Sequence, residues 1–417
     1  MIRAELVVRD LAEVATLADG PVPRAGEAMA RLGVVDGGAV AVAAGRVVWV
    51  GRERRLSGEV RLRPGAQVVE GGGGTAVPGF VDAHTHVLFA GDRANELPLK
   101  VAGASYTEIA RQGGGLFSTV RATRRAGPER LLAETGARLR GMAAAGTTTV
   151  EVKSGYALEH AGELRLLRLI PRLARRTGLR LVPTYLGAHA VPPEFARRPD
   201  DYVRSVVGRT LPAVARAGLA RYCDVFCEPG FFTVRQSERI LRAARALGLG
   251  LKVHADEFVA SGGARLAARL GAASADHLLA TPAADRRRLA EAGVIAVVLP
   301  LTAFVSSEAR RSPARELVDA GVAVALGSDC SPNSWVEAMP GVLAAAVHAG
   351  RLTPAEAVTA ATVNAAHAVG LADAGTIEVG RPADLSVFPV PSATSLGYRF
   401  DVRPSVVLRQ GKPISPP

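Results

Sequence analysis

The chain has 417 residues, 48% of them hydrophobic, and a formal net charge of +12 at pH 7. That length suits two or three domains, or one large barrel with additions. No apolar run approaches the roughly 18–20 residues that cross a bilayer, and the first 20 residues lack the pattern of a signal peptide, so we expect a cytoplasmic protein without membrane association.

The basic surplus raises the question of nucleic-acid binding, because clustered lysine and arginine bind phosphates without sequence preference. Only four of the 51 basic residues are lysines, and the arginines are scattered among alanines. Aromatic residues that could stack on bases are few. We interpret the charge as a solvated surface and expect no nucleic-acid partner.

Cysteine usage indicates a reducing compartment. Cys223, Cys227 and Cys330 leave one cysteine unpaired under any disulfide scheme. Cys223 and Cys227 lie in an apolar stretch, which favours core residues over metal ligands.

The first 70 residues are predicted to form β-structure. Short alternating apolar segments broken by glycine, such as AVAVAAGRVVWVG at 39–51, are typical of strands. The glycine-rich run at 70–80 is predicted to be a hinge into a different kind of structure.

From Phe80 onward, apolar strands alternate with segments of helical periodicity. Eight strands are predicted, at 79–86, 147–155, 180–189, 222–228, 251–257, 273–278, 294–300 and 322–329. Helical periodicity is clear at 163–176, 237–248 and 355–370. This alternation predicts an α/β fold, a (β/α)₈ TIM barrel with its active site at the C-terminal ends of the strands.

After residue 370 the pattern returns to short strands with turn glycines, at 375–390. We therefore predict that residues 1–75 and 372–417 fold together into a small β-sandwich-like domain. The remaining residues, 76–371, would form the catalytic barrel.

A His-x-His pair ends the first predicted barrel strand. In a strand, His84 and His86 project from the same face, but zinc usually needs three or four protein ligands. His254 and Asp329 fall at the ends of strands five and eight. Three imidazoles and a carboxylate suit zinc or iron better than calcium or magnesium. Ordinary hydrogen-bonded residues are the alternative, which is disfavoured because all four fall at strand ends.

Several motifs carry a resemblance to a known family. They are PGFVDAHTHVLFAGDRANE, QGGGLFSTVRATR, VEVKSGYAL, YLGAHAVPPEF, DVFCEPGFF and HADEF. The sequence resembles the amidohydrolase superfamily and, within it, the imidazolonepropionase family, over nearly the whole chain. Members of that family hydrolyse 4-imidazolone-5-propanoate to N-formimino-L-glutamate in histidine degradation. The resemblance implies a small-molecule substrate, one zinc or iron ion per chain and a homodimer.

The resemblance also implies roles for single residues. The metal ligands would be His84, His86, His254 and Asp329. Substrate contacts would come from Arg93, Tyr106, Tyr156 and His189, with Glu257 beside the ring nitrogen. Product contacts would come from Ser331, Asn333 and Ser334. Here the sequence departs from the family, because SDCSPNSW places Ser331 where asparagine is usual.

The chemistry of ring opening gives tasks to Asp329, His277, Glu257 and Arg93. A bound metal can lower the pKa of its water toward about 7, and Asp329 can then take the proton. His277, at the end of strand six, can stabilise the oxyanion or orient the water, and Glu257 can supply a proton or a hydrogen bond to the departing ring nitrogen. The planar fork of Arg93 suits the carboxylate of the propanoate tail.

Three alternatives remain at this point. A carboxylated lysine bridging two metals is disfavoured, because that lysine belongs on strand four, where this chain has Glu228, whereas Lys153 is on strand two. A heterocycle deaminase that releases ammonia is the second candidate activity, since relatives of that kind also have His-x-x-Glu on strand five. A scaffold protein without activity would be expected to lose metal ligands, and all four are present.

Overall fold

The computed structural model describes residues 1–104, 108–109, 112–305 and 311–414, and its larger sheet is a parallel barrel. The eight strands follow one another in chain order. They are β6 (Phe80–Asp82), β7 (Thr147–Lys153), β8 (Arg180–Ala188), β9 (Tyr222–Cys227), β10 (Gly250–Ala255), β11 (Ser274–His277), β12 (Ile295–Val298) and β13 (Val324–Leu326). The amide of Ala83 donates to the carbonyl of Leu326 at 3.3 Å, which joins the last strand to the first. The predicted TIM barrel and all eight of its strands are confirmed.

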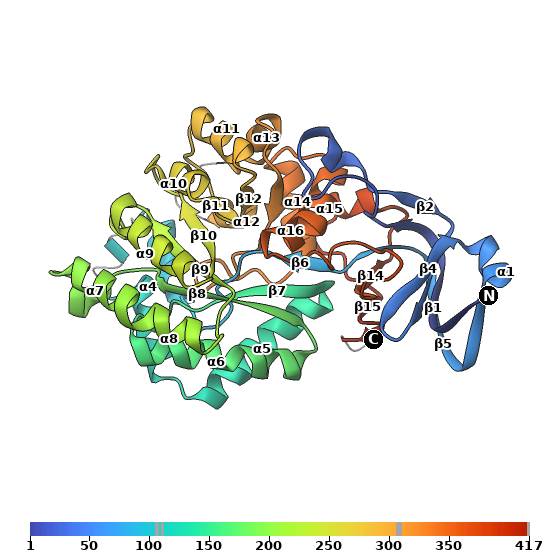
Figure 1. Ribbon diagram of the computed structural model, residues 1–417, viewed down its shortest axis with the longest axis horizontal. Coiled ribbons are helices and arrows are strands. Elements are labelled where there is room, and N and C mark those ends of the chain that lie inside the picture. Colours follow the sequence, from blue (N-terminus) through green and yellow to red (C-terminus); the bar gives the residue numbers. More distant parts are fainter. Residues whose placement is uncertain (105–107, 110–111, 306–310, 415–417) are drawn as a thin grey trace.

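Helices surround this barrel, as Figure 1 shows. The longer ones are α4 (Leu116–Arg125), α5 (Pro128–Ala144), α6 (His160–Thr177), α9 (Val234–Ala246), α11 (Ala283–Glu291), α14 (Met339–His348) and α15 (Pro354–Ala361). The shorter ones are α2 (Leu97–Val101), α7 (Pro199–Ser205), α8 (Leu211–Arg216), α10 (Gly263–Arg269), α12 (Pro300–Val305), α13 (Ala314–Asp319) and α16 (Val363–Ala368). Helix α1 (Leu56–Glu59) lies away from the barrel, beside the N-terminal strands. In α6, Leu166, Ile170 and Leu173 recur at helical spacing and are buried, which is why this segment packs on the barrel.

The helical segment predicted at 355–370 is two helices. Thr362, between α15 and α16, has φ −126° and ψ −96°, outside the helical region. Its hydroxyl donates to the carbonyl of Val358 at 2.6 Å. A hydrogen bond from a side-chain hydroxyl to a helix carbonyl competes with the hydrogen bonds of the helix backbone. The spacing of apolar residues continues through this position, so it did not predict the break.

The second sheet is built from both ends of the chain. Its strands are β1 (Ile2–Ala15), β2 (Val34–Asp36), β3 (Gly38–Ala43), β4 (Arg46–Arg52), β5 (Val60–Pro78), β14 (Leu385–Phe388), β15 (Val406–Arg409) and β16 (Lys412–Pro413). Their order is β16-β15-β14-β5-β1-β3-β4, with β2 paired to β1. Figure 1 shows this sheet beside the barrel, with both termini on its side. The predicted terminal β domain is present, whereas its division at residues 75 and 372 stays a prediction.

The glycine-rich run was wrongly predicted to be a hinge. Residues 70–78 belong to β5, which pairs with β1 on one side and with β14 on the other. Gly72 and Gly73 have φ of +59° and +70°, and the register with β1 shifts there. A Cβ on Gly74 would lie 2.5 Å from the carbonyl oxygen of Phe388. The glycines therefore allow a β-bulge and a close strand approach.

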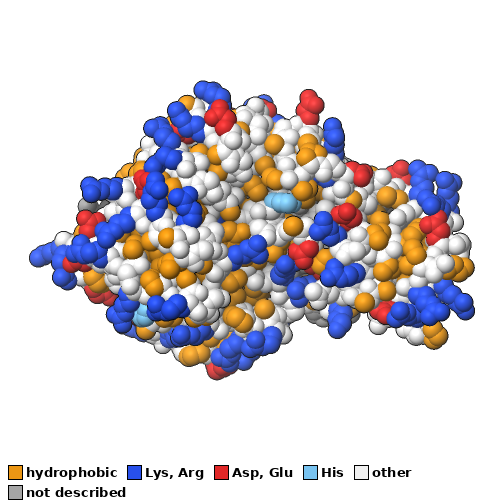
Figure 2. Space-filling view, in the orientation of Figure 1, with side chains coloured by type: hydrophobic (Ala, Val, Ile, Leu, Met, Phe, Trp, Pro, Cys, Tyr) orange, Lys and Arg blue, Asp and Glu red, His pale blue; other side chains and the backbone are white. Residues whose placement is uncertain are grey.

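The cysteines lie in the interior of the protein, and most of the basic side chains lie on its surface. All three cysteines are buried and unpaired, and Cys223 and Cys227 belong to the hydrophobic core, as predicted. Lys and Arg side chains are spread over the whole face shown in Figure 2, among acidic and apolar ones. Within the described part of the chain, no helix is both long enough and apolar enough to span a membrane.

Candidate metal centre

The four predicted metal ligands meet at the C-terminal end of the barrel. His84 and His86 follow β6, His254 lies on β10, and Asp329 follows β13. The regular strand β6 ends at Asp82, but an isolated bridge between Thr85 and Cys330 keeps the chain extended. Nε2 of His86 lies 3.2 Å from Nε2 of His84 and 3.1 Å from Nε2 of His254. Oδ1 of Asp329 lies 3.7 Å from Nε2 of His84 and 3.5 Å from Nε2 of His86.

Two buried carboxylates fix the orientation of these imidazoles. Asp276 on β11 contacts Nδ1 of His84 at 2.6 Å, and Asp224 on β9 lies 3.0 Å from Nδ1 of His254. Asp276 accepts the Nδ1 proton of His84, so the lone pair of that Nε2 faces the centre, and the Asp224 carboxylate lies beside Nδ1 of His254. Neither residue was predicted from the sequence. A charged residue inside the apolar strand YCDVFC was the signal for Asp224.

The arrangement fits a metal ion. Atoms that bind one ion at roughly 2.0–2.1 Å lie about 3–3.5 Å from each other, close to the separations found here. Each of these Nε2 atoms has another Nε2 within 3.1–3.2 Å, so one cation between them would be within reach of all three imidazoles. Burial also lowers the pKa of His84 and His86 well below the usual value, which keeps them neutral and able to bind a metal.

Beneath the histidines lies a buried network of charged residues. Nζ of Lys153 donates to Glu151 at 2.8 Å and to Asp224 at 2.7 Å. Burial alone would lower the pKa of Lys153, but the carboxylates of Asp224 and Glu151 outweigh it and raise that pKa. Lys252 donates to Ser274 at 2.8 Å and lies 3.6 Å from Asp276. Lys153 is thus an ion-pair partner of the carboxylate that orients His254.

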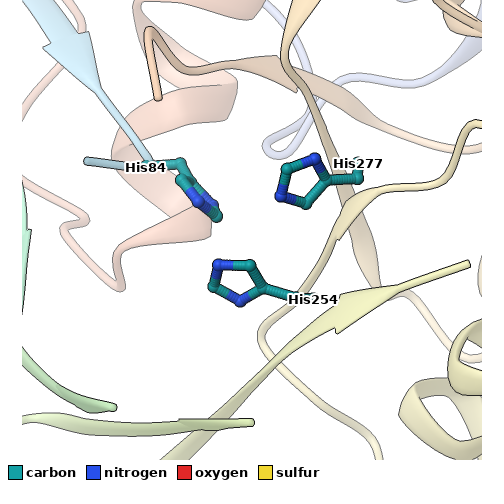
Figure 3. A group of neighbouring side chains, drawn as sticks. All are labelled: His84, His254 and His277. Atoms are coloured by element: carbon teal, nitrogen blue, oxygen red, sulfur yellow. The ribbon is translucent and has the colours of Figure 1, made fainter. Parts of the chain in front are cut away.

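His277 and Glu257 lie together on one side of the centre. Figure 3 shows the rings of His84, His254 and His277 facing one another, and the His277 ring centroid is 5.3 Å from that of His84 and 5.2 Å from that of His254. Nε2 of His277 is 3.7 Å from Oε2 of Glu257, in the loop after β10. This proximity would let both side chains contact the same bound ring.

Glu228, at the end of β9, supports the loop that carries Glu257. Its carboxylate accepts the amide hydrogens of Glu257 at 3.1 Å and Val259 at 2.8 Å. Burial raises the pKa of Glu228 to about 7. These contacts give Glu228 a positioning role.

On the opposite side, aromatic side chains pack against His86. The His189 ring stacks on it with centroids 4.8 Å apart, and the Tyr156 ring centroid is 5.9 Å away. Nδ1 of His189 donates to the carbonyl of Gly155 at 3.1 Å, which leaves Nε2 as an acceptor. Burial, with His254 nearby, lowers the pKa of His189 to about 3.

The loops after β6 and β13 complete the rim. Arg93 is buried, and its Nε and Nη2 donate to Oε2 of Glu96 at 2.9 and 2.6 Å. Lys100 of α2 donates to Oδ1 of Asn333, in the loop after β13, at 2.7 Å. Tyr106, the other predicted substrate contact, lies outside the described residues.

Asp329 is linked to this rim through Thr302 of α12. The Thr302 hydroxyl donates to Oδ2 of Asp329 at 2.9 Å and lies 3.4 Å from the Ser334 hydroxyl. The amide of Ser334 donates to Oγ of Ser331 at 3.1 Å. Burial raises the pKa of Asp329 to about 6, against the effect of the Thr302 hydrogen bond.

Known proteins with similar sequences identify the family of this chain. The model of the amidohydrolase family matches residues 75–414. An imidazolonepropionase from Symbiobacterium thermophilum is 48% identical over 95% of this chain and 93% of its own length. One from Geobacillus kaustophilus is 44% identical over 98% of this chain and 97% of its own length. The chain belongs to the imidazolonepropionase family.

Solved structures with more distant sequences share the fold of this imidazolonepropionase family member. An adenosine deaminase from Xanthomonas campestris with bound zinc has a TM-score of 0.70 at 22% identity, covering 99% of this chain and 93% of its own. A zinc complex of atrazine chlorohydrolase from Arthrobacter aurescens has a TM-score of 0.69 at 19% identity, covering 98% and 95%. At these identities the likeness concerns the fold alone.

Proposed function

We propose that this protein hydrolyses the cyclic amide of 4-imidazolone-5-propanoate to N-formimino-L-glutamate, a step of histidine degradation. The observation that carries the reaction class is the convergence of three Nε2 atoms and the Asp329 carboxylate at the barrel mouth. The substrate follows from family membership, because relatives 39–48% identical over nearly the whole chain are imidazolonepropionases. A deaminase has less support, since the zinc-bound adenosine deaminase shares only the fold.

In this proposal one zinc or iron ion is held by His84, His86, His254 and Asp329. When bound, the metal supplies a Lewis acid that makes water a stronger nucleophile near neutral pH. A single ion is favoured because Glu228, at the strand-four end, directs its carboxylate to backbone amides of the loop after β10.

The protein's own side chains would carry the protons. Asp329, held by Thr302, takes a proton from the attacking water. His277 donates a hydrogen bond to the developing oxyanion of the ring carbonyl. Glu257, 3.7 Å from His277, protonates the ring nitrogen as the carbon–nitrogen bond breaks. His189 would contact the imidazolone ring beside His86.

The rim residues would recognise the open end of the substrate. Arg93 would bind the propanoate carboxylate, with hydroxyl groups from Tyr106 and Tyr156 as further donors. Ser331, Asn333 and Ser334 would contact the product, although Ser331 offers a hydroxyl where family members usually offer an amide. Family membership is also the ground for proposing a cytoplasmic homodimer, which light scattering of the purified protein would test.

The decisive experiment is a product analysis with purified protein of known metal content. Incubation with 4-imidazolone-5-propanoate should yield formiminoglutamate, with both ring nitrogens in one acyclic molecule. Free ammonia formed at the rate of substrate loss, with an intact ring in the product, would instead assign the deaminase activity. Metal analysis of the same sample should give one ion per chain and would identify it as zinc or iron.

A further inference from the structure

Lys100 occupies an unusual place for a lysine in this chain. Of the four lysines, Lys153 and Lys252 lie buried beneath the metal centre, and Lys412 lies on the terminal sheet. Lys100 is on α2, in the segment that follows β6, and reaches the loop after β13 through its hydrogen bond to Asn333. It is therefore a partly buried cation at the rim of the site, between two loops that carry proposed substrate contacts.

The charged neighbours of Lys100 include Arg93 and Glu96. Arg93 and Glu96 form a buried ion pair, with Nη2 and Oε2 2.6 Å apart. Oε1 of the same Glu96 accepts the amide hydrogen of Gly115 at 2.7 Å. Among the described residues, no carboxylate lies within ion-pair distance of Lys100. Arg93, Glu96 and Lys100 together carry a net charge of +1.

Burial lowers the pKa of Lys100, and the like charge of Arg93 adds to this effect, while the carboxylate of Glu96 opposes it without reversing it. Both effects reflect the free-energy cost of a partly desolvated ammonium beside a second cation. A carboxylate bound there would offset that cost. The rim is thus electrostatically suited to one monovalent anion.

We infer that Lys100, held by Asn333, is a second cation of the carboxylate-binding subsite and binds the propanoate tail beside Arg93. This inference rests on the proposed function for the identity of the tail. An ammonium has three donors, and the contact with Asn333 uses one of them, so others can point to a carboxylate.

The choice of asparagine at position 333 has a physical consequence. Its amide oxygen accepts a hydrogen bond from Lys100 without neutralising the ammonium. An aspartate of nearly the same shape would form an ion pair with Lys100 and remove the surplus charge. Asn333 lies next to Ser334, which contacts Thr302, the donor to Asp329, so this charge lies on the rim of the metal centre.

Calorimetric binding to the metal-loaded protein tests the inference. The probes are imidazole-4-propanoate and its neutral propanamide, which have the same ring and tail length. The unaltered protein should bind the anion more tightly than the amide. Lys100→Gln keeps a donor for Asn333 but removes the charge, and should weaken binding of the anion about tenfold while leaving the amide unchanged. Asn333→Asp should have the same selective effect.

Two further variants separate charge from structure. Asn333→Ala removes the hydrogen bond but keeps the ammonium, and should weaken binding of the anion less than Lys100→Gln does. Lys412→Gln is the matched control for loss of a distant lysine and should change neither. Equal binding of anion and amide by the unaltered protein, or equal losses on both probes in Lys100→Gln, would overturn the inference. The probes are not hydrolysed, so this result stands apart from the product analysis that tests the proposed function.

Discussion

The role of a single imidazole at this centre is set by the residue behind it. His84 and His254 each place Nδ1 against a buried carboxylate, whereas Nδ1 of His189 meets the carbonyl of Gly155. Nδ1 of His84 and Nδ1 of His189 therefore act as donors, and each of these two rings keeps a lone pair on Nε2. Neutral rings with a fixed lone pair bind metals and accept hydrogen bonds, which is the chemistry that the site requires.

Glu257 gives the sharpest test at this scale. Glu257→Gln keeps the shape of the side chain but cannot cycle a proton to the leaving nitrogen. Bound metal should remain at the level of the unaltered protein, while kcat should fall about 10²–10⁴-fold. Steady-state kinetics and metal analysis on the same preparation measure both quantities. Near-full activity would remove Glu257 from the mechanism and leave the reaction class unchanged.

At the scale of elements, the barrel was predictable because its strands are short apolar runs that end in polar residues. The same rule located His84, His86, His254, His277 and Asp329. It could not locate groups that act from inside the barrel wall. Asp276 directly precedes His277 and Asp224 lies in the middle of β9, so neither follows the pattern of polar residues at strand ends.

Segments whose structure depends on distant partners were also unpredictable. The glycine run of β5 forms a bulge only because β1 and β14 pair on its two sides. The contact between Lys100 and Asn333 joins residues 233 positions apart. Local periodicity contains no information about such contacts, whereas it suffices for a helix such as α6.

The loop after β10 depends on Glu228 for its position, and this dependence has a pH signature. Burial raises the pKa of Glu228 to about 7, above the value of about 4.3 expected in the unfolded chain. At pH values between these two pKa values, the folded state therefore binds more protons than the unfolded chain. The free-energy cost of the buried carboxylate charge disappears as the pH falls through 7.

The test compares the free energy of unfolding of the unaltered protein with that of Glu228→Gln. We predict that the difference between them shifts in favour of the unaltered protein as the pH is lowered from 8 to 5. Urea unfolding of both proteins at several pH values measures this difference, with common titrations cancelling in the comparison. The variant should also lose kcat, because Glu257 and Val259 donate to different carboxylate oxygens, and glutamine would place an NH2 group against one of these two amides. A pH-independent difference would show that Glu228 has an ordinary pKa.

At the scale of the whole molecule, the terminal sheet and the barrel share a core. Only Gly79 separates β5 from β6, and its amide donates to the carbonyl of Asp384 at 3.0 Å. The Ser386 hydroxyl on β14 donates to the carbonyl of Gly146, just before β7, at 3.0 Å. Phe388 is fully buried, and its ring lies 5.4 Å from that of Phe80 on the first barrel strand.

These contacts predict that both sheets unfold together. The two tryptophans report on them separately, because Trp49 lies on β4 of the terminal sheet and Trp335 lies in the loop after β13. In Trp335→Phe and Trp49→Phe variants, fluorescence should give coincident urea transitions.

Phe388→Ala should lower the free energy of unfolding by about 3–5 kcal/mol in both backgrounds, since it leaves a cavity between the sheets. Tyr398→Ala, at a residue 77% exposed, is the control and should change it by no more than about 0.5 kcal/mol. If Phe388→Ala shifted only the Trp49 transition, the terminal sheet would be an independent unit, and stabilisation of the barrel by β14 would be disproved.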